Sequence, residues 1–309
     1  MLSFFLAALL PGLYWDQSPQ TADAVMQAGI ERVFVAAGQQ AAWRAAGIDA
    51  QAFDASNFVK LPPPGVEHRM NVAAATAVPW VDANGWRIDR DARHKYYYAV
   101  PWRKAALAAA EAYVYGADAV VHLDPHDLSA FGQMLAFLKS IEQPAKPVMA
   151  NIAILDDGSD DTGEVFNLLS RRNLLYRIVT APDPKYDLNV QIGTKEFPKE
   201  EALDPAAFAT LVRQKLTDEK RLLRFFGSEV VLGRLNGDGR RLRVHLINYG
   251  GGKVDGLRVR VLGIYQHGTL AAFGVKNPTL TDYQLADGGT EFTIPEMSVY
   301  AVVDLEKWP

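Results

Sequence analysis

The period of the apolar residues changes along this 309-residue chain, and that change constrains the fold more than any single motif. From Gly12 to about Ala145, short apolar runs alternate with stretches of helical period, which is typical of βα units around a mainly parallel sheet. From Ser228 onward, apolar and polar residues alternate one by one, which predicts antiparallel strands. The chain is therefore expected to combine an α/β part with an all-β part.

The first segment, residues 1–145, predicts a reduced TIM-barrel-like βα domain. Gly29 and Gly47 stand where helix C-caps are expected, and Asp127 is placed to cap the helix that follows it. Only about five strands precede Pro147, whereas a closed eight-stranded barrel needs roughly 200 residues or more. The predicted elements are strands at 12–15, 32–36 and 117–124 and helices at 21–29, 39–47 and 102–116.

The second segment, residues 146–227, predicts a flavodoxin- or amidotransferase-like α/β domain. It follows PAKP at 144–147, whose two prolines favour a linker. DDGSDD at 156–161 lacks the glutamate and glycine spacing of a calcium loop, so its acidic residues are expected to complement a helix N-terminus. The predicted elements are strands at 148–157 and 176–184, a helix at 161–173, and a long helix at 202–227 with a break near Thr217.

The third segment, residues 228–309, predicts an antiparallel β-sandwich. NGDG at 236–239 lies between two alternating runs, which is a strong hairpin signal. In a later run, Arg258 and Arg260 are expected to point outward and the valines between and after them inward.

The overall charge and composition exclude several functions. The net charge of −4 and the absence of any Lys/Arg block argue against nucleic-acid binding. The chain has no cysteine, which removes disulfides, thiolate nucleophiles and Cys-ligated zinc. The apolar run at 2–12 is too short to span a membrane. It resembles a secretory signal without its basic leader, or else a first buried element, so secretion or export to the periplasm is one of two expectations.

Aromatic residues concentrate between Asn71 and Trp102, which holds three of the six tryptophans and three consecutive tyrosines. Flat rings pack on the C–H faces of a sugar, while carboxylates and amides bind its hydroxyls. The sequence therefore predicts a carbohydrate ligand, although each tryptophan could instead pack inside its own domain. The predicted substrate-binding residues are Trp15, Asp16, Trp80, Asn84, Trp86, Tyr97, Trp102 and His122.

Three aspartates, Asp16, Asp82 and Asp124, directly follow predicted strands. Glycoside hydrolysis needs two carboxyl groups across the scissile bond. Asp124 is the preferred general acid, because partial desolvation at the end of an apolar strand would raise its pKa, and Asp82 is its predicted base or nucleophile. The alternative is that Asp124 and Pro125 form a turn that caps the following helix.

HLDPH at 122–126 would place two histidines and Asp124 on one side of an extended strand. Pro125 is expected to end the strand, so neither a metal nor another cofactor is predicted. Hydrogen bonding is the expected role of His122. Asn84 precedes Gly85, so it could also simply shape a turn.

The order of these three parts resembles the layout of family 42 glycoside hydrolases, the β-galactosidases. Residues 151–179 look like the family's middle domain, and 290–305 like the closing strands of glycosidase sandwich domains. The chain has no Asn-Glu dipeptide, where such hydrolases carry a catalytic Glu, and it lacks the Cys of amidotransferases. The resemblance therefore implies shared architecture more than shared activity. A non-catalytic carbohydrate-binding protein, or a scaffold that forms homo-oligomers, is the alternative.

Overall fold

The computed structural model describes residues 10–67 and 79–308. The apolar residues before Leu10 and the NVAAATAV run at 71–78 lie outside the described residues. The described chain falls into two units, each treated by itself below: an N-terminal unit of residues 10–67 and 82–145, and a C-terminal unit of residues 79–81 and 146–308.

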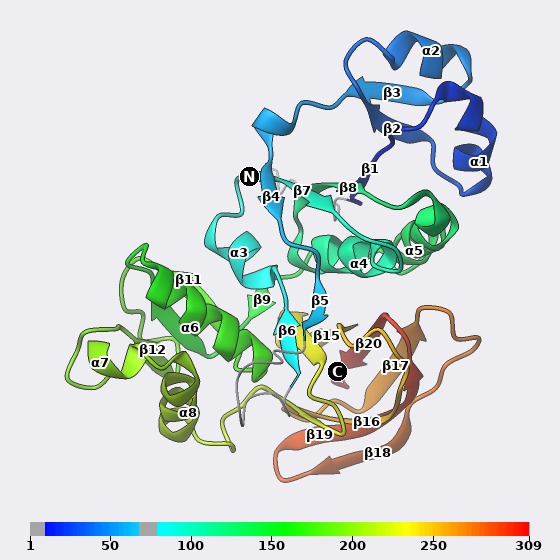
Figure 1. Cartoon of the computed structure of the whole chain (residues 1–309). Helices are drawn as coiled ribbons and strands as arrows, with labels where there is room; N and C mark the ends of the chain where they lie inside the picture. Colours follow the sequence, from blue (N-terminus) through cyan, green and yellow to red (C-terminus); the bar gives the residue numbers. More distant parts are fainter. Residues whose placement is uncertain (1–9, 68–78, 309) are drawn as a thin grey trace, which may run out of the picture. The chain divides into compact units, whose positions relative to one another are not determined.

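A parallel six-stranded sheet forms the centre of the N-terminal unit (Figure 1). Within the described residues, eight strands precede Pro147, whereas the sequence predicts about five. The order of the six-stranded sheet is β3-β2-β1-β8-β7-β4, so the first strand of the unit pairs with the last, and the other neighbours follow the chain. The strands are β1 (Gly12–Tyr14), β2 (Arg32–Val35), β3 (Asp49–Ala52), β4 (Val59–Leu61), β7 (Lys95–Ala99) and β8 (Asp118–His122). Short strands β5 (Gly65–Glu67) and β6 (Trp80–Asp82) flank the undescribed residues.

The two faces of this sheet differ in burial because side chains alternate along each strand. One residue from each of the six strands lies in a row of directly paired neighbours across the sheet, and all six are buried. These residues are Ala50, Val33, Leu13, Val121, Tyr98 and Leu61. The Tyr98 hydroxyl donates to Glu111 on α4, so α4 covers this face. The helices of the unit are α1 (Ala22–Gln27), α2 (Gln40–Ala45), α3 (Gly85–Arg90), α4 (Ala105–Tyr115) and α5 (Leu128–Ser140).

The helix ends confirm two predictions and correct one. Gly29 and Gly47 follow α1 and α2 with φ of +75° and +91°, as the left-handed C-cap requires. Asp127, predicted to cap α5, instead accepts hydrogen bonds from the backbone N–H groups of Lys104 (3.2 Å) and Ala105 (3.5 Å). Its side chain therefore caps the start of α4, because the fold brings that helix end within reach of the loop after β8.

The C-terminal unit begins with a three-stranded parallel sheet of order β11-β10-β12. The strand predicted at 148–157 is divided, because Val148 and Met149 pair with β14 (Val231–Gly237) in another sheet. The helix predicted at 202–227 was wrong beyond Thr217, whose φ is +65°. Residues 223–226 instead form a strand that pairs with β16 (Val254–Leu262). The elements are β9 (Val148–Met149), β10 (Ile152–Leu155), α6 (Asp160–Arg171), β11 (Tyr176–Val179), β12 (Leu188–Val190), α7 (Lys199–Ala202), α8 (Pro205–Leu216) and β13 (Leu223–Phe226).

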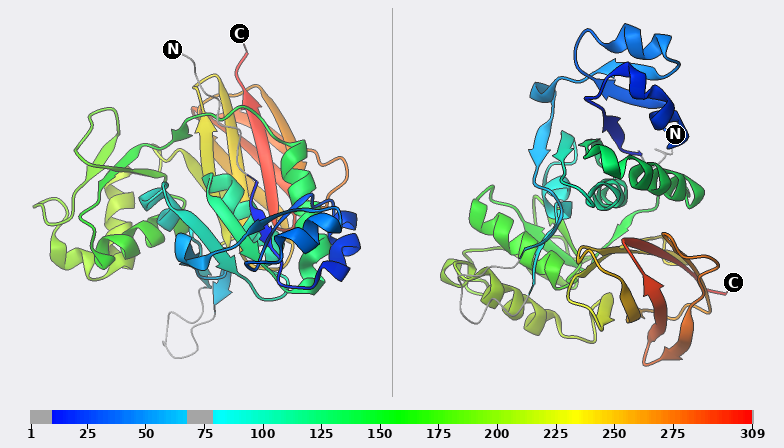
Figure 2. Two further views of the ribbon diagram at one scale, coloured as in Figure 1. Left: turned by 90° about the horizontal axis from the view of Figure 1, so that it is seen from above. Right: turned by 45° about the vertical axis from the view of Figure 1, so that its right-hand side comes forward.

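Two antiparallel sheets make up the remainder, and Figure 2 shows their yellow-to-red strands from two further directions. Their orders are β13-β16-β19-β18 and β17-β20-β15-β14-β9, and buried residues of both contribute to one hydrophobic core. The hairpin predicted at 236–239 is confirmed, and Val259 and Val261 are buried as expected. The strands are β14 (Val231–Gly237), β15 (Arg241–Asn248), β16 (Val254–Leu262), β17 (His267–Ala272), β18 (Thr281–Ala286), β19 (Gly289–Met297) and β20 (Tyr300–Glu306).

The acidic loop before α6 has a testable pH dependence. Hydrogen bonds from Ser159 and then Thr162 lower the pKa of Asp157 from 3.8 to about 2. A pKa lowered by folding contributes stability above the unfolded value, which is lost as the pH falls towards 2. Allowing for its exposure, we expect Asp157→Asn to cost about 1 kcal/mol of unfolding free energy at pH 7 and almost nothing near pH 2. Urea denaturation at both pH values measures this, and a loss that persists near pH 2 would contradict it.

Candidate functional site

A hollow of about 510 Å³ lies at the carboxyl ends of β1, β7 and β8 in the N-terminal unit. This is the edge of a parallel sheet at which the loops after successive strands meet. Three of the residues predicted from sequence, Asp16, His122 and Asp124, come together there. The hollow is lined by Asp16, Gln17, Ala99, Val100, Pro101, His122, Leu123, Asp124 and Pro125.

Asp16 is held in place by two neighbouring side chains. Nε2 of His122 lies 3.0 Å from Asp16 Oδ2, and Nε2 of Gln17 donates to Asp16 Oδ1 at 2.7 Å. The pair joins the ends of β1 and β8, which are adjacent only because the first strand pairs with the last. The hydrogen-bonding role predicted for His122 is therefore confirmed.

Asp124 differs from the prediction in its electrostatics. Its Oδ1 accepts a hydrogen bond from the backbone N–H of His126 at 2.9 Å and lies 2.7 Å from the Nδ1 of the same residue. These bonds lower the pKa of Asp124, whereas a general acid requires a raised pKa. Asp124 also caps the short turn Pro125–Asp127, so the turn of the alternative interpretation is present, but the Asp124 side chain does not cap α5 itself. The expectation of a raised pKa was wrong because the carboxylate is exposed and hydrogen-bonded.

A group of half-buried aromatic rings adjoins the hollow on the sheet face opposite α4. We call Tyr14, Phe53, Tyr97 and His122 the ring cluster. Its ring centroids lie 4.4 Å apart for Tyr14 and Phe53, 4.9 Å for Phe53 and Tyr97, and 5.1 Å for Tyr14 and His122. Burial first, and then the neighbouring Tyr14 and Asp16, raise the pKa of Tyr97, so its hydroxyl stays protonated at neutral pH.

Two of the tryptophans predicted to bind substrate lie in the core instead. Trp15 is 2% exposed and its indole N–H donates to Thr21 Oγ1 at 2.9 Å, while Trp86 is 8% exposed. Buried indoles of this kind cannot stack on a ligand, which corrects the prediction for both. Trp102 is 55% exposed but does not line the hollow. Trp80 belongs to the C-terminal unit, where the guanidinium of Arg171 lies 3.9 Å from its ring centroid.

Asn84 and Asp82 are also placed away from the hollow. Asn84 is 1% exposed, and its amide donates to Glu111 Oε2 and to the carbonyl of Pro62, both at 3.0 Å. It is therefore a structural residue, and its predicted contact with substrate was wrong. Asp82 interacts electrostatically with Lys104 and is not among the residues lining the hollow. Its pairing with Asp124 stays a prediction.

Tyr14 and Phe53 are site residues that the sequence prediction missed. Tyr14 lies between the buried Leu13 and Trp15 on β1, so it shares its face of the sheet with Asp16. That alternation was readable in GLYWD at 12–16. Phe53 follows β3, and no sequence signal connects it with Tyr97.

Among the described residues, no three His, Cys, Asp or Glu side chains gather to form a metal site. Within the same part of the chain, every helix is too short or too polar to cross a bilayer.

No protein-family model and no curated protein matches the chain. Among solved structures, it is similar to α-L-fucosidase isoenzyme 2 from Paenibacillus thiaminolyticus, with a TM-score of 0.56 and 9% identity over 93% of this chain and 71% of the fucosidase chain. This likeness shows a glycoside-hydrolase-like fold, which the sequence resemblance implied.

Two further structures are similar at lower scores. A β-galactosidase from Bacillus circulans sp. alkalophilus has a TM-score of 0.43 and 8% identity over 89% of this chain and 63% of its own. A rhamnosidase from Novosphingobium sp. PP1Y has a TM-score of 0.46 and 10% identity over 93% of this chain and 38% of its own. The chain thus spans less than two thirds of either protein, and these scores add no argument about the fold.

Proposed function

We propose that the chain binds a saccharide across the ring cluster and the adjoining hollow. The observation that carries the proposal is the Asp16–His122 pair, 3.0 Å apart, beside the half-buried rings of Tyr14 and Tyr97. Aromatic faces suit the apolar side of a sugar ring, and the carboxylates suit its hydroxyls. The glycoside-hydrolase-like fold also supports a carbohydrate ligand.

Hydrolysis by two carboxylates is the second candidate function, favoured by the presence of Asp16 and Asp124 around one hollow. The lowered pKa of Asp124 suits a base or nucleophile and not an acid. Both oxygens of Asp16 are already engaged by neighbouring side chains, Oδ1 by Gln17 and Oδ2 by His122. We therefore place binding first and hydrolysis second, with Asp82 as the alternative partner of Asp124.

We further propose the three-part architecture expected from sequence: a reduced barrel at 1–145, an amidotransferase-like domain at 146–227 and a β-sandwich at 228–309. The pairing of the first strand with the last supports the barrel, because a closed (β/α) barrel has the same neighbour order. Two antiparallel sheets around one core support the sandwich. The finer kinship with family 42, and assembly into a homo-oligomer, are parts of the same proposal.

A screen of oligosaccharides and aryl glycosides, read by thermal shift and by turnover, tests the proposed function. We expect at least one neutral saccharide to raise the melting temperature, because a ligand that prefers the native state stabilises it. Tyr97→Ala and Asp16→Asn should each weaken its binding about tenfold, through a lost ring contact and a lost charge-assisted hydrogen bond. Turnover that Asp124→Asn abolishes would establish hydrolysis, and binding without turnover would establish the non-catalytic function.

Trp102→Ala is the matched control, because it removes an exposed ring that does not line the hollow. Asp82→Asn tests the sequence-based pairing in the same way. Equal losses for Trp102→Ala and Tyr97→Ala, or the absence of any saturable saccharide shift, would contradict the proposed location of the site.

A further inference from the structure

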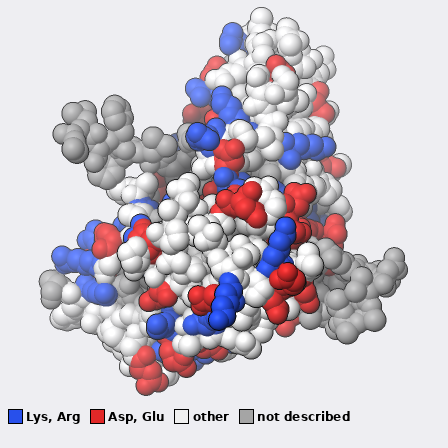
Figure 3. Space-filling view, turned by 90° about the vertical axis from the view of Figure 1, so that its left-hand side faces the viewer, with Lys and Arg blue, Asp and Glu red and all other residues white. Residues whose placement is uncertain are grey.

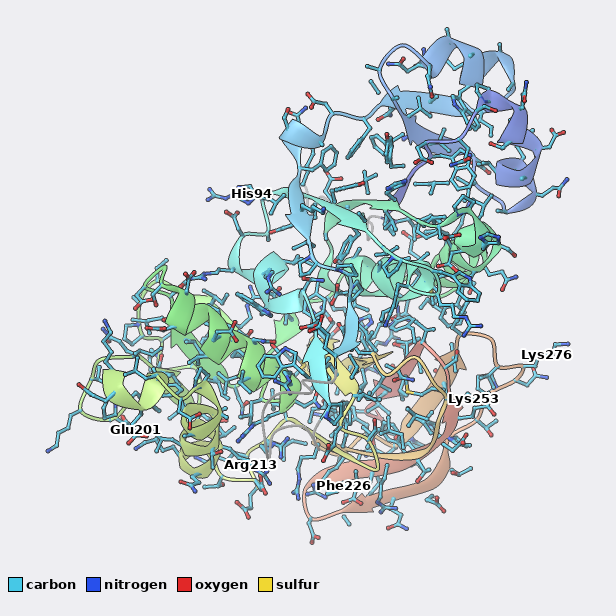
Figure 4. The ribbon with its side chains drawn as sticks, in the orientation of Figure 1. His94, Glu201, Arg213, Phe226, Lys253 and Lys276 are labelled. Atoms are coloured by element: carbon cyan, nitrogen blue, oxygen red, sulfur yellow. The ribbon has the colours of Figure 1, made fainter. Side chains whose placement is uncertain are left out.

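A second cavity, of about 650 Å³, lies wholly within the C-terminal unit and shares no lining residue with the hollow. It is lined by residues of α6, α8 and β13, and Figure 4 labels two of them, Arg213 and Phe226. Its composition is unusual because five arginines and only one carboxylate, Glu229, surround it. The arginines are Arg171, Arg172, Arg213, Arg221 and Arg224.

Arg221 is a largely enclosed member of these five arginines, which we call the arginine cluster. Its side chain is 10% exposed, and its Nη2 donates to the carbonyl oxygen of Arg172 at 2.9 Å. Its Nη1 contacts Asp218 Oδ1 at 3.4 Å, while its buried Nε has no hydrogen-bond partner among the described residues. A buried donor without a partner is costly, so it is a natural place for a ligand acceptor.

Asp218 neutralises only part of the positive charge of the arginine cluster. It accepts two hydrogen bonds from Arg213, at 2.8 and 2.7 Å, and these bonds lower its own pKa to about 2. Burial, and then repulsion by Arg213, lower the pKa of both Arg172 and Arg221. The guanidinium groups therefore repel one another, and an added anion would relieve that repulsion.

Aromatic side chains form the remaining wall of the cavity. The Arg171 guanidinium lies 3.9 Å from the Trp80 ring centroid, and Arg224 lies 5.4 Å from that of Phe226. Phe226 is 46% exposed, which is high for a phenylalanine that belongs to a strand. A ligand with an apolar ring next to its charged group would cover this surface.

We propose that this cavity binds a small molecule in which a ring carries a phosphate monoester. Guanidinium forks match the oxygen geometry of a phosphate, and its double negative charge fits a lining with four more positive than negative side chains better than a single carboxylate does. The volume suits one small ligand. On the face shown in Figure 3, Lys and Arg are interspersed with Asp and Glu, unlike the continuous basic stripe that a polynucleotide needs.

Calorimetric titration of the full chain, in a buffer free of phosphate and sulfate, tests the proposal. The probes are inorganic phosphate, glucose 6-phosphate, AMP, glucuronate and neutral glucose. We expect saturable binding of inorganic phosphate and tighter binding of one ring-bearing phosphate. A preference for glucose 6-phosphate would indicate a sugar ester, and a preference for AMP a nucleotide.

Arg224→Gln is the main variant, because the Arg224 side chain lines the cavity and makes no hydrogen bond to another described residue. We expect it to weaken phosphate binding about tenfold or more, as the loss of a charge-assisted hydrogen bond does. Arg221→Gln should weaken binding at least as much, with thermal melting confirming that it folds. Arg240→Gln, at an exposed turn of the same unit, is the matched control and should leave binding unchanged.

Three outcomes would overturn the proposal. The first is the absence of saturable binding for every phosphate probe, and the second is binding that Arg224→Gln and Arg240→Gln affect equally. The third is glucuronate binding as tightly as glucose 6-phosphate, which would exclude a site built for a dianion. Tyr97→Ala should not alter phosphate binding, so failure here and failure of the saccharide proposal are separable.

Discussion

Replacement of Glu111 by leucine is expected to lower the free energy of unfolding by about 3 kcal/mol or more. Glu111 is fully buried on α4, and its carboxyl oxygens accept hydrogen bonds from the Asn84 backbone N–H at 2.7 Å and from the Asn84 amide and the Tyr98 hydroxyl, both at 3.0 Å. Leucine fills a similar volume but accepts no hydrogen bond. These buried donors would then lose their acceptor, at a cost of about 1–3 kcal/mol each.

A double-mutant cycle with Tyr98→Phe, followed by urea denaturation, measures this network. Burial first, and then Glu111, raise the pKa of Tyr98 well above its usual value, so its hydroxyl donates throughout the accessible pH range. Tyr98→Phe should therefore be destabilising in the wild type and close to neutral when Glu111 is already leucine. Additive effects of the two substitutions would show that the hydrogen bond contributes nothing.

Gly132→Ala is expected to destabilise the N-terminal unit by about 2 kcal/mol, although alanine favours helices by about 1 kcal/mol over glycine. A Cβ atom at Gly132 would lie 2.0 Å from the backbone oxygen of Ala28. A backbone atom cannot rotate away, so α5 would have to separate from the end of α1. This contact packs the last helix of the unit on the first, next to the strands β1 and β8 that hold Asp16 and His122.

Gly252→Ala is the matched control for this substitution, because no atom of the described residues lies within 4 Å of a Cβ atom there. It should be neutral or slightly stabilising through a less flexible unfolded chain. Thermal unfolding of both variants measures the difference. A Gly132→Ala protein as stable as the wild type would mean that α1 and α5 are not in close contact.

Secondary structure was largely predictable where the period of the apolar residues and the residues that form turns and helix caps indicated the same element. The glycines after α1 and α2, the hairpin at 236–239 and the alternation in β16 each depend on local backbone preferences that neighbouring residues set. The helix prediction after Thr217 was wrong because the apolar residues there fit either a helical or an alternating period. Pairing of β13 with residues of β16 that lie 32 to 38 positions later in the chain decided in favour of a strand.

The tryptophans were the least reliable guide to the site. Burial of a large aromatic ring lowers the free energy whether the ring packs in a core or against a ligand. The tryptophan residue type therefore does not distinguish the two roles, and Trp15 and Trp86 pack in the core. Tyr14 and Tyr97 stay half-exposed because they lie on the sheet face opposite the helices. The arginine cluster was likewise not predictable from the sequence, since its members come from segments up to about fifty residues apart.

Local order is thus what the amino-acid sequence determines here: the succession of α/β and all-β segments, most element boundaries, and a set of acidic residues at strand ends. The tertiary structure alone decides which of those residues meet. Asp16 and His122 are 106 positions apart and touch because the first strand of the unit pairs with the last. Such long-range pairing depends on the summed burial of whole strands and helices, which no short stretch of sequence encodes.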